Sequence, residues 1–186
     1  TLNLLETCRT TKSLKSLICV TSDKCYESNY SLKGFKESDK LGGKDPYSGS
    51  KACAEIIVKT YIDSFFKYSK IAVATARAGN VIGGGDWSEN RLIPDAVRSI
   101  NKNKTIIIRN PNFNRPWQHV LEPLKGYLIL AMEQYDKPIK FSGAWNFGTN
   151  PKSITSVKKI VEYIIKFWGN GKLISKKNNF YEQENL

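Results

Sequence analysis

The stretch LICVTSDK, residues 17–24, decides how the chain folds. Its first half is a short apolar run, which is typical of a buried strand in a parallel sheet. Its second half is polar and follows that strand directly. Because open α/β sheets bind their ligands at the carboxyl ends of the strands, we expect residues 21–24 to belong to a functional site.

Strands and helices alternate along the rest of the chain. Apolar, β-rich runs predict further strands at residues 71–75, 105–108 and 145–147, and apolar periodicity predicts helices at residues 46–68, 92–101, 121–134 and 153–167. Residues 1–9 form a shorter amphipathic piece, and residues 79–90 a Gly-rich loop. This alternation predicts an α/β fold, with a parallel sheet covered by helices on both faces.

The helix expected at residues 46–68 has a clear start signal. Asp45 is suited to cap the helix, and Pro46 is suited to its first position. Apolar residues then surround most of the helix, so we expect it to be buried on two sides. One side would cover the sheet, and the other is suited to face a partner subunit.

The first turns of this helix carry Tyr47 and Lys51, four residues apart and therefore on one face. A nearby ammonium favours the phenolate form of a tyrosine, and a phenolate can take a proton from an alcohol while hydride leaves the same carbon. With nine tyrosines in the chain, about one Tyr-x-x-x-Lys match is expected by chance. The context of the pair must therefore decide its meaning.

Composition excludes several classes of protein. No apolar run approaches the roughly 20 residues that span a bilayer. The net charge of +12 suggests nucleic acid, but the lysines are scattered, outnumber the arginines and form no long run, so we expect no nucleic-acid partner. Four cysteines without a C-x-x-C pair and a single histidine predict no metal site. Reduced thiols are typical of a cytoplasmic protein.

Three motifs occur together in a familiar order. Ser22-Asp23 follows a strand, Pro46-Tyr47-x-x-x-Lys51 opens a helix, and Arg77-x-x-Asn80-x-x-Gly83 follows the next strand. This combination resembles the extended, nucleotide-sugar branch of the short-chain dehydrogenase/reductase superfamily. The resemblance implies a Rossmann-like doubly wound sheet with a smaller mixed α/β substrate-binding subdomain. We expect residues 1–78 to belong to the NAD-binding domain, and residues 79–186 to the nucleotide-sugar-binding region interleaved with returning sheet elements.

Longer stretches resemble one enzyme group within that branch, the CDP-glucose 4,6-dehydratases. They are VTSDKCY (residues 20–26), ARAGNVIGGGDW (76–87) and RPWQHVLEPL (115–124). Related dTDP-glucose dehydratases carry Thr-Asp-Glu at the active site, and Lys24 stands at the position of that Glu. The implied activity is a lyase reaction on CDP-glucose, in the synthesis of deoxysugars for surface polysaccharides such as lipopolysaccharide O-antigen.

The resemblance assigns roles to five catalytic residues. Tyr47 would accept the proton of the sugar 4-hydroxyl, Ser22 would hydrogen-bond near the 4-oxygen, and Asp23 would protonate the departing 6-hydroxyl. Lys24 would either take the C5 proton or stabilise the enolate, and both roles stay open because a free lysine has a pKa of about 10.4. Lys51 would hold the nicotinamide ribose and tune the tyrosine.

Binding residues follow from the same resemblance. Tyr47, Lys51 and Arg77 would contact the cofactor NAD. Asn80, Arg91 and Arg115 would contact the nucleotide sugar, and the guanidinium of Arg115 is suited to a diphosphate. The family also implies a homodimer in the full-length protein.

The chain contains no G-x-G-x-x-G or G-x-x-G-x-x-G after a strand. In the family this motif binds the pyrophosphate of the cofactor. We therefore interpret the chain as the catalytic part of a longer enzyme and expect it to be inactive by itself. The alternatives are another enzyme of the same branch, such as an epimerase or a dTDP- or GDP-sugar dehydratase, a basic binding module, and an inactive remnant.

Overall fold

The computed structural model describes residues 1–27, 34–150 and 153–176. It divides the chain into two compact units. Unit 1 comprises Thr1–Gly79 and Val120–Gly148, and unit 2 comprises Asn80–His119 and Thr149–Leu186. No helix within the described residues is long and apolar enough to cross a membrane.

Unit 1 is built on a three-stranded parallel sheet in the order β1-β2-β7. The strands are β1 (Ser16–Val20), β2 (Ala72–Ala78) and β7 (Gly143–Phe147). The central strand β2 is buried along its whole length, as expected of a parallel strand with neighbours on both edges. These three strands confirm the ones that the sequence predicts at 17–20, 71–75 and 145–147.

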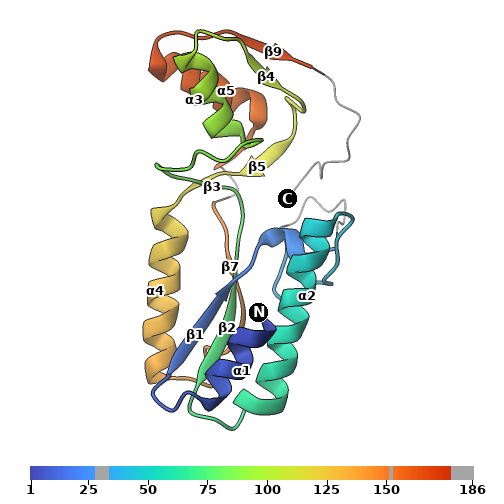
Figure 1. Cartoon of the computed structure of the whole chain (residues 1–186), viewed down its shortest axis with the longest axis vertical. Coiled ribbons are helices and arrows are strands. Elements are labelled where there is room, and N and C mark those ends of the chain that lie inside the picture. Colours follow the sequence, from blue (N-terminus) through green and yellow to red (C-terminus); the bar gives the residue numbers. More distant parts are fainter. Residues whose placement is uncertain (28–33, 151–152, 177–186) are drawn as a thin grey trace. The chain divides into compact units, whose positions relative to one another are not determined.

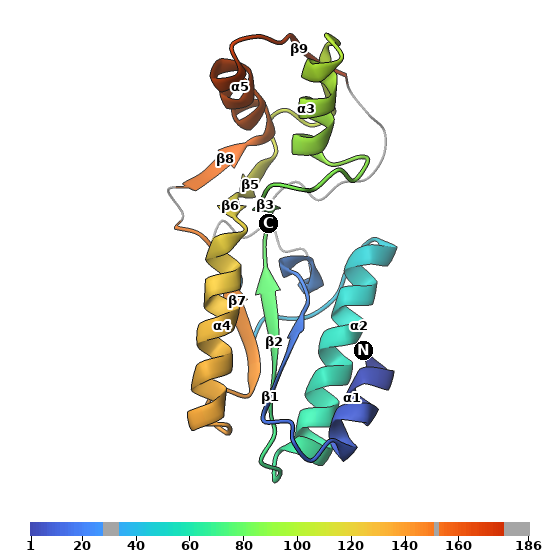
Figure 2. The same ribbon diagram turned by 60° about the vertical axis from the view of Figure 1, so that its left-hand side comes forward.

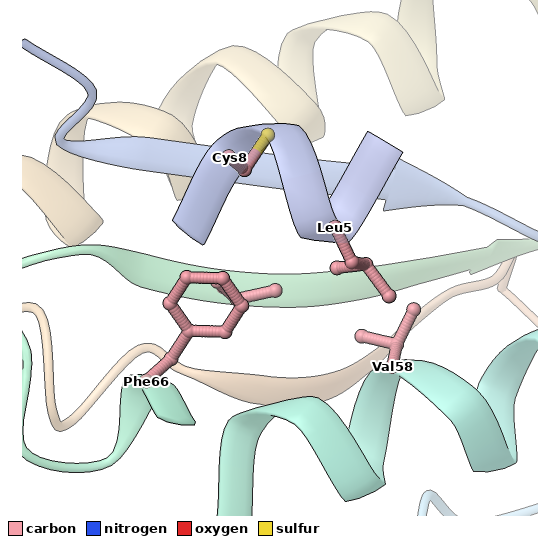
Figure 3. Close-up of a cluster of buried hydrophobic side chains, with 5 residues drawn as sticks. Leu5, Cys8, Val58 and Phe66 are labelled. Atoms are coloured by element: carbon pink, nitrogen blue, oxygen red, sulfur yellow. The ribbon is translucent and has the colours of Figure 1, made fainter. Parts of the chain in front are cut away.

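Helices cover both faces of this sheet. Figures 1 and 2 show α1 (Leu2–Thr10) and α2 (Pro46–Tyr61) together on one face and α4 (Leu121–Asp136) on the other. Between α1, α2 and β2, Leu5 and Val58 are fully buried (Figure 3). The α/β fold with a parallel sheet between helical layers is therefore confirmed.

The start of α2 agrees with the sequence, and the helix ends in a π-helical turn. The Asp45 carboxylate accepts hydrogen bonds from the backbone amides of Tyr47 and Ser48, both at 3.0 Å, as an N-cap does. The α-helix ends at Tyr61 and continues as a π-helical turn, Ile62–Phe66. The helix that the sequence predicts to about residue 68 therefore continues to Phe66, with a π-helical last turn, and Phe66 belongs to the core cluster (Figure 3).

The second side of α2 is open in this chain. Ile56 is 54% exposed, whereas Ala52 and Val58 are buried. The homodimer that would cover the outer side remains a prediction.

The described residues of unit 2 form two helices and three small sheets. The helices are α3 (Leu92–Asn101) and α5 (Val157–Trp168); the paired strands are β3 (Val81–Ile82) with β6 (Gln118–His119), β4 (Ile106–Ile108) with β9 (Leu173–Ser175), and β5 (Asn114–Pro116) with β8 (Ile154–Ser156). The core joins Ile100 of α3, Ile106 and Ile108 of β4, and Val161 of α5. The predicted helix at 92–101 and strand at 105–108 are confirmed.

One helix of unit 2 begins later than its pattern indicates. The apolar spacing predicts a helix from residue 153, but residues 154–156 form β8, which pairs antiparallel with β5. The helix starts at Val157, with Ser156 as its cap accepting a hydrogen bond from the amide of Lys159 at 3.2 Å. Ile154 fits the helical period, but the strand partner that decides its conformation is distant in sequence.

Candidate active site

The segment after β1 forms a tight turn that fixes the first predicted catalytic residues. Ser22 is buried and caps a short 3-10 helix, Asp23–Cys25. Its hydroxyl accepts a hydrogen bond from the amide of Lys24 at 3.2 Å and donates one to Oδ1 of Asp23 at 3.1 Å. Three predicted catalytic residues therefore share one local hydrogen-bonded turn.

Tyr47 lies close to two ammonium groups. The Lys51 Nζ lies 5.6 Å from the centroid of the Tyr47 ring, and the Lys24 Nζ lies 5.9 Å from it. The tyrosine is 51% exposed, so a substrate can reach it from solvent. The structure thus brings together the lysine of the strand-end turn and the Tyr-Lys pair of α2, which are two dozen residues apart in sequence.

Asp45 adds a negative charge at the start of the same helix. The hydroxyl of Ser48 donates to its carboxylate at 2.6 Å, which lowers the pKa of Asp45. Partial burial opposes this change, while the two capping amides and the positive charge of Lys24 support it. The cap that begins α2 is thereby tied electrostatically to the turn after β1.

Beneath these residues lies a buried ion pair. The Arg77 Nη2 donates to Oε2 of Glu55 at 2.6 Å, and the two side chains are 4% and 2% exposed. The Nη1 of Arg77 donates to the Tyr26 hydroxyl at 2.7 Å and to the Glu37 carbonyl at 3.1 Å. Burial alone would lower the pKa of Arg77, but the hydrogen bonds to Glu55 and Tyr26 outweigh it and raise the pKa.

These contacts bear on the cofactor role that the sequence assigns to Arg77. Both terminal nitrogens of its guanidinium are engaged with protein groups inside unit 1. A structural role in the core fits this geometry. Contact between Arg77 and NAD stays a prediction that the arrangement does not favour.

The sequence interpretation missed two members of this network. Glu55 was hidden among the apolar residues of its helix. Tyr26 is 1% exposed, stacks on Phe35 at 4.6 Å between ring centroids, and donates to Oδ1 of Asn146 on β7 at 2.6 Å. The available signal was a charged residue on the buried side of a helix, since unpaired charges are almost never fully buried.

The predicted substrate-binding residues all belong to unit 2. Arg115 is 4% exposed on β5, and its guanidinium carbon lies 5.4 Å from the centroid of the Phe113 ring. Arg91 is 64% exposed and pairs with Asp86 at 3.5 Å. Asn80 accepts a hydrogen bond at its carbonyl from the amide of Gln118, at 3.0 Å. Their contacts with a substrate stay predictions.

Unit 1 also contains a cavity of about 640 Å³. Its wall includes Glu55 and Arg77, the apolar side chains of Val58 and Phe66, and Ile139. The predicted catalytic side chains of residues 22–24, 47 and 51 do not line it. The reaction is therefore not expected to take place in this cavity.

The residues present fit one end of a nicotinamide cofactor. Tyr47 and Lys51 present a hydroxyl and an ammonium on one face of α2, and both groups can hydrogen-bond to ribose hydroxyls. The Gly-rich loop that would meet the pyrophosphate is not part of this sequence. Within the described residues, no group of His, Cys, Asp and Glu side chains is arranged to hold a metal ion.

The comparison with protein families gives the class. Residues 1–148 match the model of the NAD dependent epimerase/dehydratase family, and the chain belongs to this family. Within it, the CDP-glucose 4,6-dehydratase of Salmonella typhimurium is 45% identical over 175 residues, which cover 91% of this chain and 49% of the relative. The resemblance to this enzyme group that the motifs indicate is thereby confirmed.

More distant relatives agree with this placement. The dTDP-D-glucose 4,6-dehydratase of Dictyostelium discoideum is 29% identical over 175 residues, covering 87% of this chain and 38% of that protein. The chain therefore spans about half, or less, of the length of these curated relatives. The activity of a whole enzyme is accordingly a matter for proposal.

Solved structures show the same fold. The dTDP-glucose 4,6-dehydratase of Bacillus anthracis in complex with NAD matches 99% of this chain and 54% of its own, with a TM-score of 0.76 and 23% identity. The UDP-N-acetylglucosamine 4-epimerase of Methanobrevibacter ruminantium matches 99% and 56%, with a TM-score of 0.82 and 20% identity. Dehydratases and epimerases share this fold, so the fold by itself does not choose between the two reactions.

Proposed function

We propose that the chain carries the catalytic residues of an NAD-dependent enzyme that converts CDP-glucose to CDP-4-dehydro-6-deoxyglucose. The observation that carries the proposal is that the ammonium groups of Lys24 and Lys51 both lie within 6 Å of the centroid of the Tyr47 ring. The 45% identity to a CDP-glucose 4,6-dehydratase supports the choice of substrate. Tyr47 and Lys51 would hold NAD, which would supply the hydride chemistry of the reaction, that is, removal of hydride from C4 of the sugar and its return to C6.

Tyr47 acts in the first step. Its phenolate accepts the proton of the 4-hydroxyl as the C4 hydride departs, and the two flanking ammonium groups stabilise the negative oxygen. Ser22 holds the 4-oxygen by a hydrogen bond. Lys51 binds the ribose of the cofactor, which fixes the nicotinamide against the sugar.

Asp23 and Lys24 act in the second step, the loss of water. The new 4-ketone acidifies the C5 proton, which passes to Lys24 if Lys24 acts as the base, or to a water molecule if Lys24 instead stabilises the enolate by its charge. Asp23 protonates the 6-hydroxyl so that it leaves as water. The resulting C5–C6 double bond then takes up the hydride at C6 and a proton at C5.

Unit 2 supplies the remaining binding groups in this proposal. Arg115 would bind the diphosphate, and Asn80 and Arg91 would contact the phosphate, sugar or nucleotide. A second copy of the protein would cover the outer side of α2, where Ile56 is exposed. The net charge of +12 is consistent with an anionic ligand. The apolar residues on this helix are consistent with a dimer partner.

The test is turnover of CDP-glucose by the full-length gene product. The wild type should release a 4-keto-6-deoxy sugar nucleotide, and Tyr47→Phe should lower kcat by at least about 100-fold, because it removes the proton acceptor. Tyr68→Phe is the matched control, since Tyr68 is 89% exposed and lies beyond α2. Unchanged turnover in Tyr47→Phe would refute the proposed mechanism.

Substrate choice and the role of Lys24 need separate measurements. Turnover of UDP-, dTDP- and GDP-sugars in place of CDP-glucose, or epimerisation without loss of water, would favour the alternative enzymes of the same branch. Lys24→Arg keeps the charge but cannot act as a base, so it should retain more activity than Lys24→Met. Equal loss in both variants would assign the base role to Lys24.

A further inference from the structure

Glu55 is a buried carboxylate on the reactive face of α2. It lies one turn after Lys51 and two turns after Tyr47, so the three residues share one side of the helix. Its side chain is 2% exposed. Burying a charge is costly unless it is paired and hydrogen-bonded, so the contacts of this carboxylate indicate why it is there.

Both oxygens of the carboxylate are engaged by the sheet. Oε2 accepts hydrogen bonds from the Thr75 hydroxyl at 2.7 Å and from Arg77 Nη2 at 2.6 Å, and both partners lie on β2. Oε1 accepts a hydrogen bond from the hydroxyl of Thr21. The Glu55 side chain is therefore hydrogen-bonded both to the middle strand, β2, and to the residue that follows β1.

The contact with Thr21 is the one that reaches the active site. Thr21 immediately precedes Ser22, and its amide donates to the carbonyl of Ala76 at 2.9 Å, which continues the β1–β2 pairing past the end of β1. The turn with Ser22, Asp23 and Lys24 begins at this point. A hydrogen bond from Glu55 to Thr21 therefore joins the origin of this turn to the helix that carries Tyr47 and Lys51.

We infer that Glu55 is a positioning residue for the reaction, which sets the place of Tyr47 and Lys51 relative to the turn at Ser22 through its bond to Thr21. The inference rests on the proposed function. Its physical basis is that proton and hydride transfer require near-attack geometry, and a displacement of about 1 Å can cost about 100-fold in rate. Oε2 would anchor the carboxylate to β2, and Oε1 would transmit that position to the active-site turn.

Two substitutions of the same kind separate positioning from stability. Thr21→Val and Thr75→Val each replace one threonine hydroxyl that donates to Glu55 with a methyl group of similar size. After Thr75→Val, Arg77 still holds Oε2, so the carboxylate stays in place. After Thr21→Val, the bond to the active-site turn is lost.

The experiment measures kcat, KM and urea unfolding of both variants of the full-length gene product, with the sugar nucleotide that the wild type turns over. We expect similar unfolding midpoints, a kcat about 10- to 100-fold lower in Thr21→Val, and a kcat within about twofold of wild type in Thr75→Val. KM should change little in either. Deuterium at C4 of the sugar should slow Thr21→Val more than the wild type, because a misplaced Tyr47 makes hydride removal limiting.

Thr21→Ser keeps the hydroxyl and should restore kcat, which also guards against a folding defect in the valine variant. Equal kcat in both valine variants, or a kcat that follows the unfolding midpoint, would overturn the inference and leave Glu55 with a structural role. An inactive wild type would instead refute the proposed function, and the inference would fall with it. Activity in the wild type and in Thr75→Val, with loss in Thr21→Val, would support both.

Discussion

Removing one partner of the buried ion pair should destabilise the protein far more than removing both. Arg77→Met leaves Glu55 charged and 2% exposed, with the threonine hydroxyls but no cation. Breaking a buried pair in this way typically costs about 3–5 kcal/mol. The double variant Arg77→Met with Glu55→Met removes both charges, and well-packed apolar replacements of a buried pair are often close to neutral.

The assay is urea unfolding at neutral pH, analysed as a double-mutant cycle. We expect a coupling free energy of at least about 2 kcal/mol, because the two groups are in direct contact. The pair Lys59 and Asp63 is a matched control: its Nζ and Oδ2 are also 2.6 Å apart, but its side chains are 76% and 58% exposed. Lys59→Met should leave the midpoint almost unchanged. Additive costs in the cycle, or a similar small effect at both sites, would refute the reasoning.

Three further predictions concern α2 and the turn before it. Asp45→Asn should destabilise the protein by about 0.3–1 kcal/mol at neutral pH, because asparagine still accepts the capping hydrogen bonds but lacks the charge that a helix N-terminus favours. Since the folded pKa is lowered, this difference should be present above the unfolded value of about 3.9 and should disappear in urea titrations as the pH falls through the lowered pKa. Iodoacetamide at pH 8 should label the exposed Cys53 and spare Cys25, whose pKa burial raises to about 12, and mass spectrometry of the native protein would detect either thiol. Gly43→Ala should lower the thermal midpoint, because an added Cβ would lie 2.5 Å from a side-chain atom and 2.7 Å from backbone atoms of α2, whereas Gly49→Ala should raise it slightly, since nothing lies within 4 Å of its Cβ.

Local chemistry explains which elements the sequence predicted well. The start of α2 depends on Asp45 and Pro46, and the capping hydrogen bonds are made within three residues. The end of that helix depends instead on the packing of Phe66 in a core cluster that also contains Leu5 and Cys8 of α1. Likewise, Ile154 pairs with a strand some forty residues earlier in the chain, across from Pro116. Periodicity describes one segment at a time, so it could not anticipate either partner.

In the candidate site too, local spacing predicted some relations between residues, whereas others depend on tertiary packing. Tyr47 and Lys51 are joined by helical spacing, and Ser22 to Lys24 by adjacency, so both groups were recognisable in the sequence. That the two groups meet at one tyrosine ring follows from the register of β1 with β2 and the packing of α2. The ion pair of Glu55 with Arg77 spans 22 residues and two elements, so the helical pattern could mark Glu55 as a buried charge but could not identify its partner.

The motif Arg77-x-x-Asn80 was informative because its first residue lies inside β2 and its last residue lies just beyond it, and these positions limit what each side chain can contact. Arg77 lies inside β2, where its side chain is directed to Glu55 in the core. Asn80 follows Ala78, the last residue of the strand, by two positions, so its Cα lies within about 7 Å of the strand end in any arrangement of the two units. The carboxyl ends of parallel strands are where ligands bind in such sheets. Of the three predicted substrate contacts, Asn80 is therefore the one that chain connectivity alone keeps near the carboxyl end of β2.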